Sequence, residues 1–172
     1  MNSRRYATRI ARPRSALHIR GTPIISVLLG SMIVALVPVV AQAPLLPPFG
    51  LMIFLGWRVL RPDIWPLWAG APLGLFDDVM SGQPIGSAIF LWTAILLLLD
   101  VENQRHVWRD YWHGWFTATL ALGLALTGGW FFVHIGGHGG SLVQILPQLA
   151  YSVGLFPLIV RLCAALDRWR LP

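Results

Sequence analysis

The chain carries the segment Gly70-Ala71-Pro72-Leu73-Gly74-Leu75-Phe76-Asp77-Asp78-Val79-Met80-Ser81-Gly82-Gln83-Pro84-Ile85-Gly86, here called segment 70–86. Four of its glycines and Asp78 recur at every fourth position, a spacing that places residues on one face of a helix. Glycines on such a face let another backbone approach closely, and an acid in hydrocarbon must face protein or water. Ser81, Gly82 and Pro84 are turn formers. The segment predicts a closely packed helix that ends in a polar turn.

The composition of the whole chain is typical of an integral membrane protein. Of 172 residues, 56% are hydrophobic and 12% are charged, whereas soluble domains contain about 45–50% apolar and about 25% charged residues. A soluble domain of this length has too small an interior to bury so much apolar surface, and the same composition excludes intrinsic disorder. The net charge of +6 is typical of nucleic-acid-binding proteins, but the apolar composition argues against a nucleic-acid partner.

Apolar runs along the chain predict an all-α protein with about six transmembrane helices, because a helix needs about 20 residues to cross a bilayer. The runs cover residues 23–43, 46–60, 64–80, 85–99, 111–133 and 142–162. The third run is rich in glycine and proline, which is typical of a broken or re-entrant span. We therefore expect a basic tail over 1–22, a transmembrane domain over 23–166 and a short tail over 167–172.

The arginines predict the orientation of these spans. All 13 cationic side chains are arginines, and all fall on one side of a six-span arrangement. The positive-inside rule then places both termini in the cytoplasm. Near anionic lipid, each arginine contributes roughly 1 kcal/mol of attraction. Besides those of the N-terminal tail, we expect the following arginines to set topology and to contact membrane lipids: Arg58, Arg61, Arg105, Arg109, Arg161 and Arg168.

No pattern in the sequence is typical of catalysis, of a metal site or of a cofactor. The chain has no nucleophile elbow, phosphate-binding loop or dinucleotide fingerprint. His134 and His138 have a spacing that suits a metal on a helix, but they flank two glycines and have no third ligand nearby. Asp77 and Asp78 point about 100° apart on a helix, so they do not naturally share one site. We predict a protein that is not an enzyme and binds neither metal nor cofactor.

Segment 70–86 resembles the signature of the rod shape-determining protein MreD family, a small-residue helix followed by Gly-x-x-x-Asp-x-x-Ser-Gly-x-x-x-Gly. The turn from Arg58 to Pro62, Pro157, the basic C-terminal end and the chain length are also similar. Asp77 is an additional acid beside the acid of the signature. The residues that match the signature in order are Gly74, Asp78, Ser81, Gly82 and Gly86.

The resemblance implies a non-catalytic, multi-pass scaffold of the bacterial inner membrane that belongs to the cell-elongation machinery. Members of the family associate with an MreC-like protein, the MreB filament, a RodA-like glycosyltransferase and a penicillin-binding transpeptidase. The implied fold is a compact helix bundle similar to the substrate-binding subunits of vitamin transporters. We expect segment 70–86 to serve either in helix packing or as a surface for the transmembrane helix of a partner, and Asp78 to hold the outer turn.

The alternative is a substrate-binding subunit of a vitamin or metal transporter, which has a similar size and a similar number of helices. Such a subunit needs an outward pocket, for which the candidates are Asp77, Trp92, His134 and Gln148. It also needs a small-residue face for the coupling subunit, and Gly70–Gly74 would serve.

Overall fold

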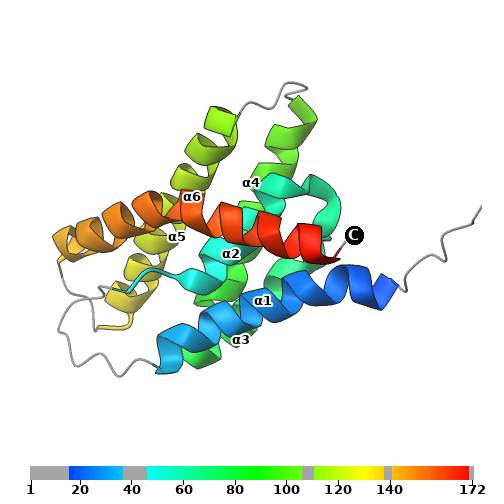
Figure 1. The fold of residues 1–172 in the computed structure, drawn as a ribbon. Coiled ribbons are helices and arrows are strands. Elements are labelled where there is room, and N and C mark those ends of the chain that lie inside the picture. The colour runs from blue at the N-terminus through cyan, green and yellow to red at the C-terminus, as the bar shows by residue number, and fades with distance from the viewer. Residues whose placement is uncertain (1–15, 37–45, 106–110, 138–140, 171–172) are drawn as a thin grey trace, which may run out of the picture.

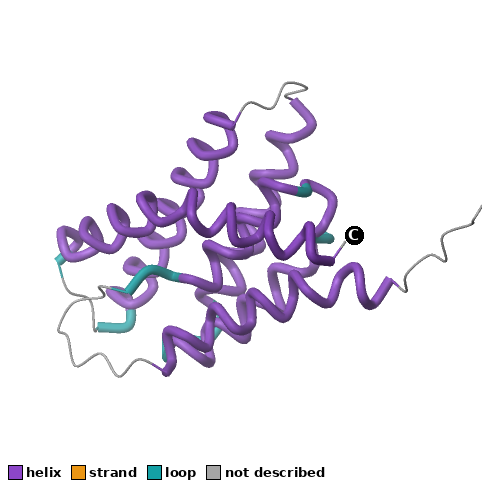
Figure 2. Tube along the Cα trace, in the orientation of Figure 1, coloured by secondary structure: helices purple, strands orange, loops and turns teal. Residues whose placement is uncertain are grey.

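The computed structural model describes residues 16–36, 46–105, 111–137 and 141–170, which form helices and short connections without any strand (Figures 1 and 2). The predicted all-α class is confirmed over these residues, and one α-helix overlaps each apolar run. The α-helices are α1 (Ala16–Leu36), α2 (Phe49–Leu60), α3 (Gly70–Ser81), α4 (Ser87–Arg105), α5 (Tyr111–Ile135) and α6 (Ile145–Arg170). Short 3₁₀ helices are η1 (Pro62–Ile64), η2 (Leu67–Ala69) and η3 (Leu142–Gln144).

Helix α2 forms the centre of the fold, and every residue from Gly50 to Arg58 is buried. Helices α1, α5 and α6 pack on α2, and α6 crosses it in Figure 1. The ring of Phe54 lies between two tryptophans, with centroid distances of 5.0 Å to Trp65 and 4.9 Å to Trp92. The indole N–H of Trp65 donates to the carbonyl oxygen of Phe54 at 3.0 Å. The turn after α2 is thereby fixed to the core.

Helices α3 and α4 form a closely packed antiparallel pair beside this core. Only residues 82–86 connect them, so α4 folds back directly along α3. Helix α1 packs on both α2 and α3 and joins the pair to the centre. The break expected within the third apolar run lies before Gly70, at η1 and η2, and α3 itself is continuous.

Several helix boundaries differ from the apolar runs, most clearly at the start of α1 and the end of α6. Helix α1 begins at Ala16 instead of Pro23, because hydropathy marks the apolar part of a helix and not the first residue of its backbone. Helix α6 continues through the expected tail over 167–172 as far as Arg170, so this segment is helical up to that residue. Residues 37–43 of the first predicted span lie outside the described residues.

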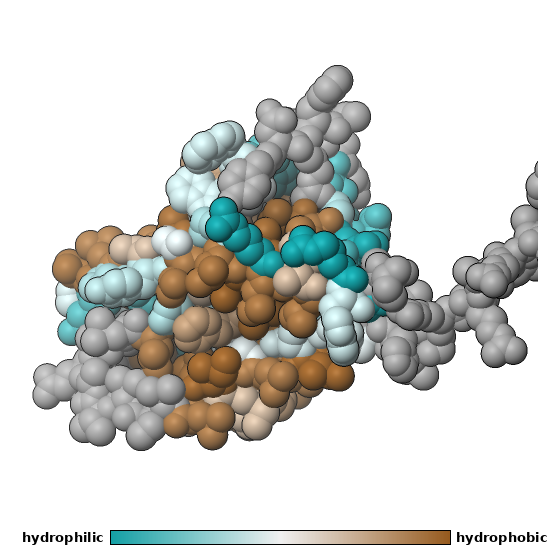
Figure 3. Space-filling view, in the orientation of Figure 1, coloured by the Kyte–Doolittle hydropathy of each residue, from teal (hydrophilic) through white to brown (hydrophobic). Residues whose placement is uncertain are grey.

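Within the described residues, two segments are long and apolar enough to cross a membrane, Trp112–Ile135 and Leu142–Arg170. Only 17% and 22% of their apolar windows are buried inside the fold. The exposed side chains of these segments include Phe116, Leu120 and Leu158. Figure 3 shows a largely hydrophobic surface on the face that it displays. Helices α1, over Gly21–Leu36, and α2 are apolar but shorter.

Candidate functional site

The carboxylate of Asp78 joins the end of α3 to the beginning of α4. Its side chain is only 1% exposed. Oδ2 accepts the backbone N–H of Gly86 at 2.8 Å, and Oδ1 accepts the N–H of Ala88 and the hydroxyl of Ser87, both at 2.9 Å. The first N–H groups of a helix lack partners within the helix and carry partial positive charge. The preceding helix therefore supplies the cap of α4, and we call this group of four residues the Asp78 clasp.

Glycine and proline shape the turn inside the clasp. Gly82 and Gly86 have φ values of +67° and +105°, a region in which residues with a Cβ are strained. Gly82 ends α3 in the left-handed conformation common after helices, and the hydroxyl of Ser81 donates to the carbonyl oxygen of Asp77 at 2.7 Å. The carbonyl oxygen of Pro84 accepts the N–H of the first residue of α4 at 3.0 Å. These contacts turn the chain so that α4 starts against Asp78.

Gly70 and Gly74 face α4 of the same chain. A Cβ on Gly74 would lie 2.7 Å from the carbonyl oxygen of Ala88, and a Cβ on Gly70 would lie 3.0 Å from the Cα of Thr93. Both neighbours are backbone atoms, so a larger side chain requires the two helices to separate. Of the two expected roles, helix packing is the one that the structure shows for these glycines, because they pack against α4 of the same chain and not against a partner or a coupling subunit. Their surface is already covered, because the short turn folds α4 onto it.

Asp77 points toward α1 and takes no part in the clasp. The hydroxyl of Ser31 donates to its Oδ1 at 2.6 Å. Gly50 of α2 lies at the same place, since a Cβ there would come within 3.0 Å of that oxygen. The two neighbouring acids thus bind different helices, as the angular step of about 100° predicts. They do not form a pair able to share a proton in acid–base chemistry.

The residues expected to line an outward ligand pocket each have other neighbours. Trp92 is buried in the core, the ring of His134 stacks on Trp130 with a centroid distance of 4.9 Å, and the amide of Gln148 donates to the carbonyl oxygen of Leu46 at 2.6 Å. None of these contacts, nor the one made by Asp77, joins two of the four candidates. The structure therefore does not bring them together in one ligand site.

At the opposite ends of the helices, charged side chains connect segments that are distant in sequence. The guanidinium of Arg58 lies 3.2 Å from Asp100 and links α2 to α4. Arg61 donates through two nitrogens to Oδ2 of Asp167 at 3.1 Å and 2.9 Å, while Arg170 donates to Oδ1 at 2.7 Å. One carboxylate therefore holds two arginines and links α2 to α6.

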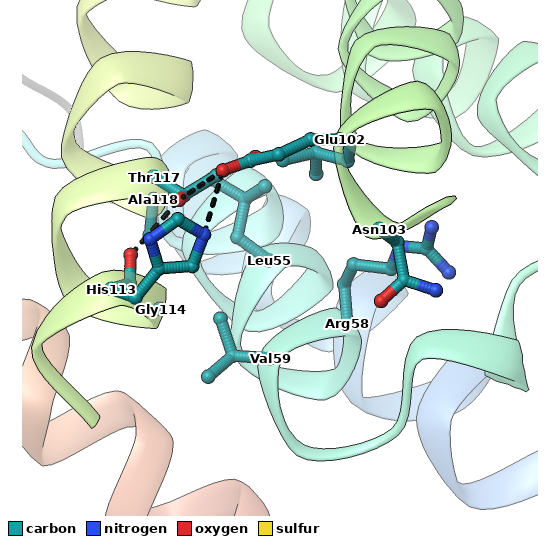
Figure 4. Close-up of a pocket in the computed structure, with 10 residues that line it drawn as sticks. Leu55, Arg58, Val59, Glu102, Asn103, His113, Gly114, Thr117 and Ala118 are labelled. Atoms are coloured by element: carbon teal, nitrogen blue, oxygen red, sulfur yellow. Dashed lines mark hydrogen bonds and ion pairs between the residues drawn. The ribbon is translucent and has the colours of Figure 1, made fainter. Parts of the chain in front are cut away.

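A third polar contact closes a small cavity between α2, α4 and α5 (Figure 4). His113 Nε2 lies 2.8 Å from Oε1 of Glu102, and the hydroxyl of Thr117 is 3.1 Å from the same oxygen. A nucleophile must contact its base directly, whereas here the hydroxyl and the imidazole both contact the carboxylate. The cavity measures about 40 Å³ and has an apolar floor formed by Leu55 and Val59. This arrangement is suited to joining helices.

These ion pairs are missed by sequence reasoning, because their partners come from different helices. Arg61 and Asp167 are 106 positions apart, and no local spacing signals such a pair. Of the other arginines assigned to topology, Arg161 and Arg168 are exposed on α6. Arg109 and the side chain of Arg105 lie outside the described residues, as does His138. Within the described residues, no group of three or more His, Cys, Asp or Glu side chains is arranged to hold a metal ion.

Comparisons with protein-family models, with curated proteins and with solved structures give no significant match to this chain. The contacts within the chain are therefore the basis for a functional proposal. These contacts fall into two groups. One is the α3–α4 hairpin, which the buried Asp78 holds at its turn. The other is the set of interhelical ion pairs at the C-terminal ends of α2 and α4.

Proposed function

We propose that the chain is a multi-pass protein of the bacterial inner membrane that acts as a non-catalytic scaffold of the cell-elongation machinery. It binds an MreC-like partner and links the MreB filament to peptidoglycan synthases of the RodA and penicillin-binding classes. The proposal extends the resemblance of segment 70–86 to the MreD family.

The observation that carries this proposal is the use of the signature acid. The three hydrogen bonds that Asp78 accepts all come from the start of α4. A carboxylate occupied in this way serves architecture, whereas an acid that binds a ligand or transfers a proton needs an open position. The remaining signature residues form the turn and the close contact between α3 and α4. A buried acid and close-contact glycines that serve helix packing suit a scaffold.

The proposed arrangement has six spans with both termini in the cytoplasm. Helices α5 and α6 provide two apolar segments of sufficient length. The Arg61–Asp167 ion pair places the basic ends of α2 and α6 next to each other, and the positive-inside rule favours such ends on one side of the membrane. Helices α2 and α3 have 12 residues each, a rise of about 18 Å against about 30 Å of hydrocarbon. Short helices are compatible with a membrane where protein surrounds them, and α2 is buried from Gly50 to Arg58.

Reporter fusions test the arrangement. Fusions after residues 45 and 138 are expected to report the periplasm, and a fusion after residue 105 is expected to report the cytoplasm. A cytoplasmic signal at residue 138 would refute the six-span topology.

Depletion and co-purification test the function. Depleting the protein from rod-shaped cells is expected to round them, and affinity purification in mild detergent is expected to recover an MreC-like protein. Wild-type protein and the exposed-site variant Asp63→Asn should restore rods, whereas Asp78→Ala should not. Unchanged rods after complete depletion would refute the scaffold. Recovery of a transport ATPase together with a tightly bound small molecule would instead identify a transporter subunit.

A further inference from the structure

Helices α4 and α5 form an elongated crevice that adjoins the small cavity of Figure 4. The crevice measures about 170 Å³, and Figure 1 shows the two helices diverging toward the C-terminal end of α4 and the N-terminal end of α5. Leu99, Glu102 and Thr117 line both spaces, so the crevice and the small cavity meet at these side chains. The residues that line the crevice are Ile95, Leu98, Leu99 and Glu102 of α4 and Thr117, Leu120, Ala121 and Leu124 of α5.

The crevice changes from apolar to polar along its length. On α4 its lining runs from Ile95 to Glu102, seven residues later, which is a rise of about 10 Å. On α5 it runs in the same way from Leu124 to Thr117. The hydroxyl of Thr117 lies 3.1 Å from Glu102, so both polar side chains are at the same end of the crevice. The proposed topology places that end toward the cytoplasm and the apolar end toward the middle of the bilayer.

Glu102 offers a free acceptor at the polar end. Its Oε1 contacts His113 and Thr117, whereas its Oε2 accepts no hydrogen bond from the described residues. The side chain is 31% exposed, so a ligand can reach this oxygen. Arg58, the cation that lines the adjoining cavity, lies 3.2 Å from Asp100. The polar end therefore presents a carboxylate oxygen that suits a positively charged hydrogen-bond donor.

The size of the crevice favours an acyl chain over a helix of another protein. A piece of helix about 10 Å long and about 10 Å wide fills roughly 800 Å³, which is far more than the volume of the crevice. A cavity of about 150 Å³ holds one benzene molecule, so the crevice has room for part of one hydrocarbon chain. Leu98 and Leu120 are exposed beside it, and the apolar part is therefore open to the lipid side of the fold.

We propose that the crevice binds an aminophospholipid of the cytoplasmic leaflet, with the primary ammonium group on Oε2 of Glu102 and one acyl chain between Leu98 and Leu120. The inference rests on the membrane placement proposed above. The ammonium group donates a charge-assisted hydrogen bond to the carboxylate, and the acyl chain covers apolar side chains of both helices. The lipid thereby fills the space between α4 and α5 on the side that their own packing leaves open.

The test is native mass spectrometry of the full-length protein from micelles that contain phosphatidylethanolamine and phosphatidylcholine with identical acyl chains. The two lipids have the same net charge, but only the head group of phosphatidylethanolamine carries N–H donors. Wild type is expected to retain phosphatidylethanolamine at least about fivefold more strongly, because one charge-assisted hydrogen bond distinguishes the two lipids. Equal retention by the wild type would overturn the inference without any variant.

The head group is tested by changing the acid. Glu102→Gln places an amide donor where the ammonium group would donate, so it should reduce the preference to within about twofold. The matched control Asp63→Asn removes an exposed acid that does not line the crevice, and it should keep the preference of the wild type. Thermal unfolding of both variants checks that the fold is intact. An unchanged preference in folded Glu102→Gln would overturn the role of this acid.

The acyl chain is tested by filling the apolar part. Leu124→Trp should lower the retention of both lipids by at least about threefold, because it occupies apolar space that the chain would cover. The matched control Leu158→Trp changes an exposed leucine of α6 and should stay within about twofold of wild type. Equal losses in the two tryptophan variants would show general contact with lipid instead of a site.

Two further outcomes would overturn the inference. Retention of phosphatidylglycerol as strongly as phosphatidylethanolamine would show that the ammonium group is not recognised. Displacement of the lipid by millimolar ethanolamine would identify a site for a free amine. If the reporter fusions show membrane integration while the lipid test fails, the aminophospholipid site is refuted and the proposed function stands.

Discussion

The backbone N–H of Ala88 donates to Oδ1 of Asp78 at 2.9 Å, although the two residues belong to different helices. On the same side of α3, the carbonyl oxygen of Ala88 lies where Gly74 leaves room for it. The N–H and the carbonyl of one residue thus fix the acid and the glycine of segment 70–86. Two contacts therefore hold the hairpin of α3 and α4. One is polar and lies at the turn, and the other is a close backbone contact one helical turn before Asp78 in α3.

Replacing the two acids is expected to have unequal effects. Asp78→Asn turns an amide donor toward a backbone N–H, and the loss of one hydrogen bond to a buried charge should lower the free energy of unfolding by about 1.5–3 kcal/mol. Asp77→Asn keeps a carbonyl oxygen that can accept the hydroxyl of Ser31, so its loss should be below about 1 kcal/mol. Denaturant titration in detergent, followed by tryptophan fluorescence, measures both. A larger loss for Asp77→Asn would contradict the assignment of the clasp to Asp78.

Substitution by alanine is expected to affect stability differently at glycines in close contact with another helix and at glycines with open space around them. Gly74→Ala places its Cβ 2.7 Å from backbone atoms of α4, and this overpacking should cost about 1–3 kcal/mol of stability. Gly123→Ala is the matched control, because it lies inside α5 with no atom within 4 Å of the new Cβ. The control should be neutral or stabilising by up to about 1 kcal/mol, since alanine favours a helix over glycine. Thermal unfolding curves of the two variants should move in opposite directions or differ clearly in size.

The sequence predicts the helices well because their signal is local. Apolar runs are long enough to mark the helices, and every α-helix of the described chain overlaps one run. The glycine spacing of segment 70–86 likewise predicts a close helix contact. It does not identify the partner, because the spacing shows that another helix can approach this face closely but not which helix does so. The five-residue turn between α3 and α4 makes the chain itself the occupant.

Contacts between segments that are distant in the chain could not be predicted from the sequence. Asp100 follows a leucine-rich run and reads as a simple interfacial residue, yet it pairs with Arg58 of α2. Glu102 has the spacing of a local helical ion pair with Arg105, but in the structure it contacts His113 across the two helices. The contact with His113 depends on the packing of α4 on α5, which local spacing does not reveal.

The hydrogen bond of the buried Trp57 indole to Ser26 is expected to couple α1 to α2 energetically. Its N–H donates to the hydroxyl of Ser26 at 2.9 Å, and the guanidinium of Arg170 lies 5.2 Å from the ring centroid. Ser26→Ala leaves that N–H buried without its acceptor, which should cost about 1–3 kcal/mol. In a Trp57→Phe background, where no N–H remains, the same change should cost less by at least about 1 kcal/mol. Additive losses in this double-mutant cycle would show that the hydrogen bond contributes no coupling.

Because Asp167 binds both Arg61 and Arg170, we expect its substitution to lower stability more than substitution of Arg61 does. Asp167→Asn removes the charge that holds both Arg61 and Arg170, so it should cost about 1.5–3 kcal/mol. The side chain of Arg61 is 47% exposed, and Arg61→Gln should cost at most about 1 kcal/mol because solvent screens such pairs. Asp63→Asn, an exposed acid on the adjacent turn, is the matched control and should change stability by less than about 0.5 kcal/mol. The three free energies of unfolding, measured at low salt and again at 0.5 M salt, should keep this order, with the Arg61→Gln effect reduced at high salt. Equal losses for Asp167→Asn and Arg61→Gln would mean that Arg170 does not depend on Asp167.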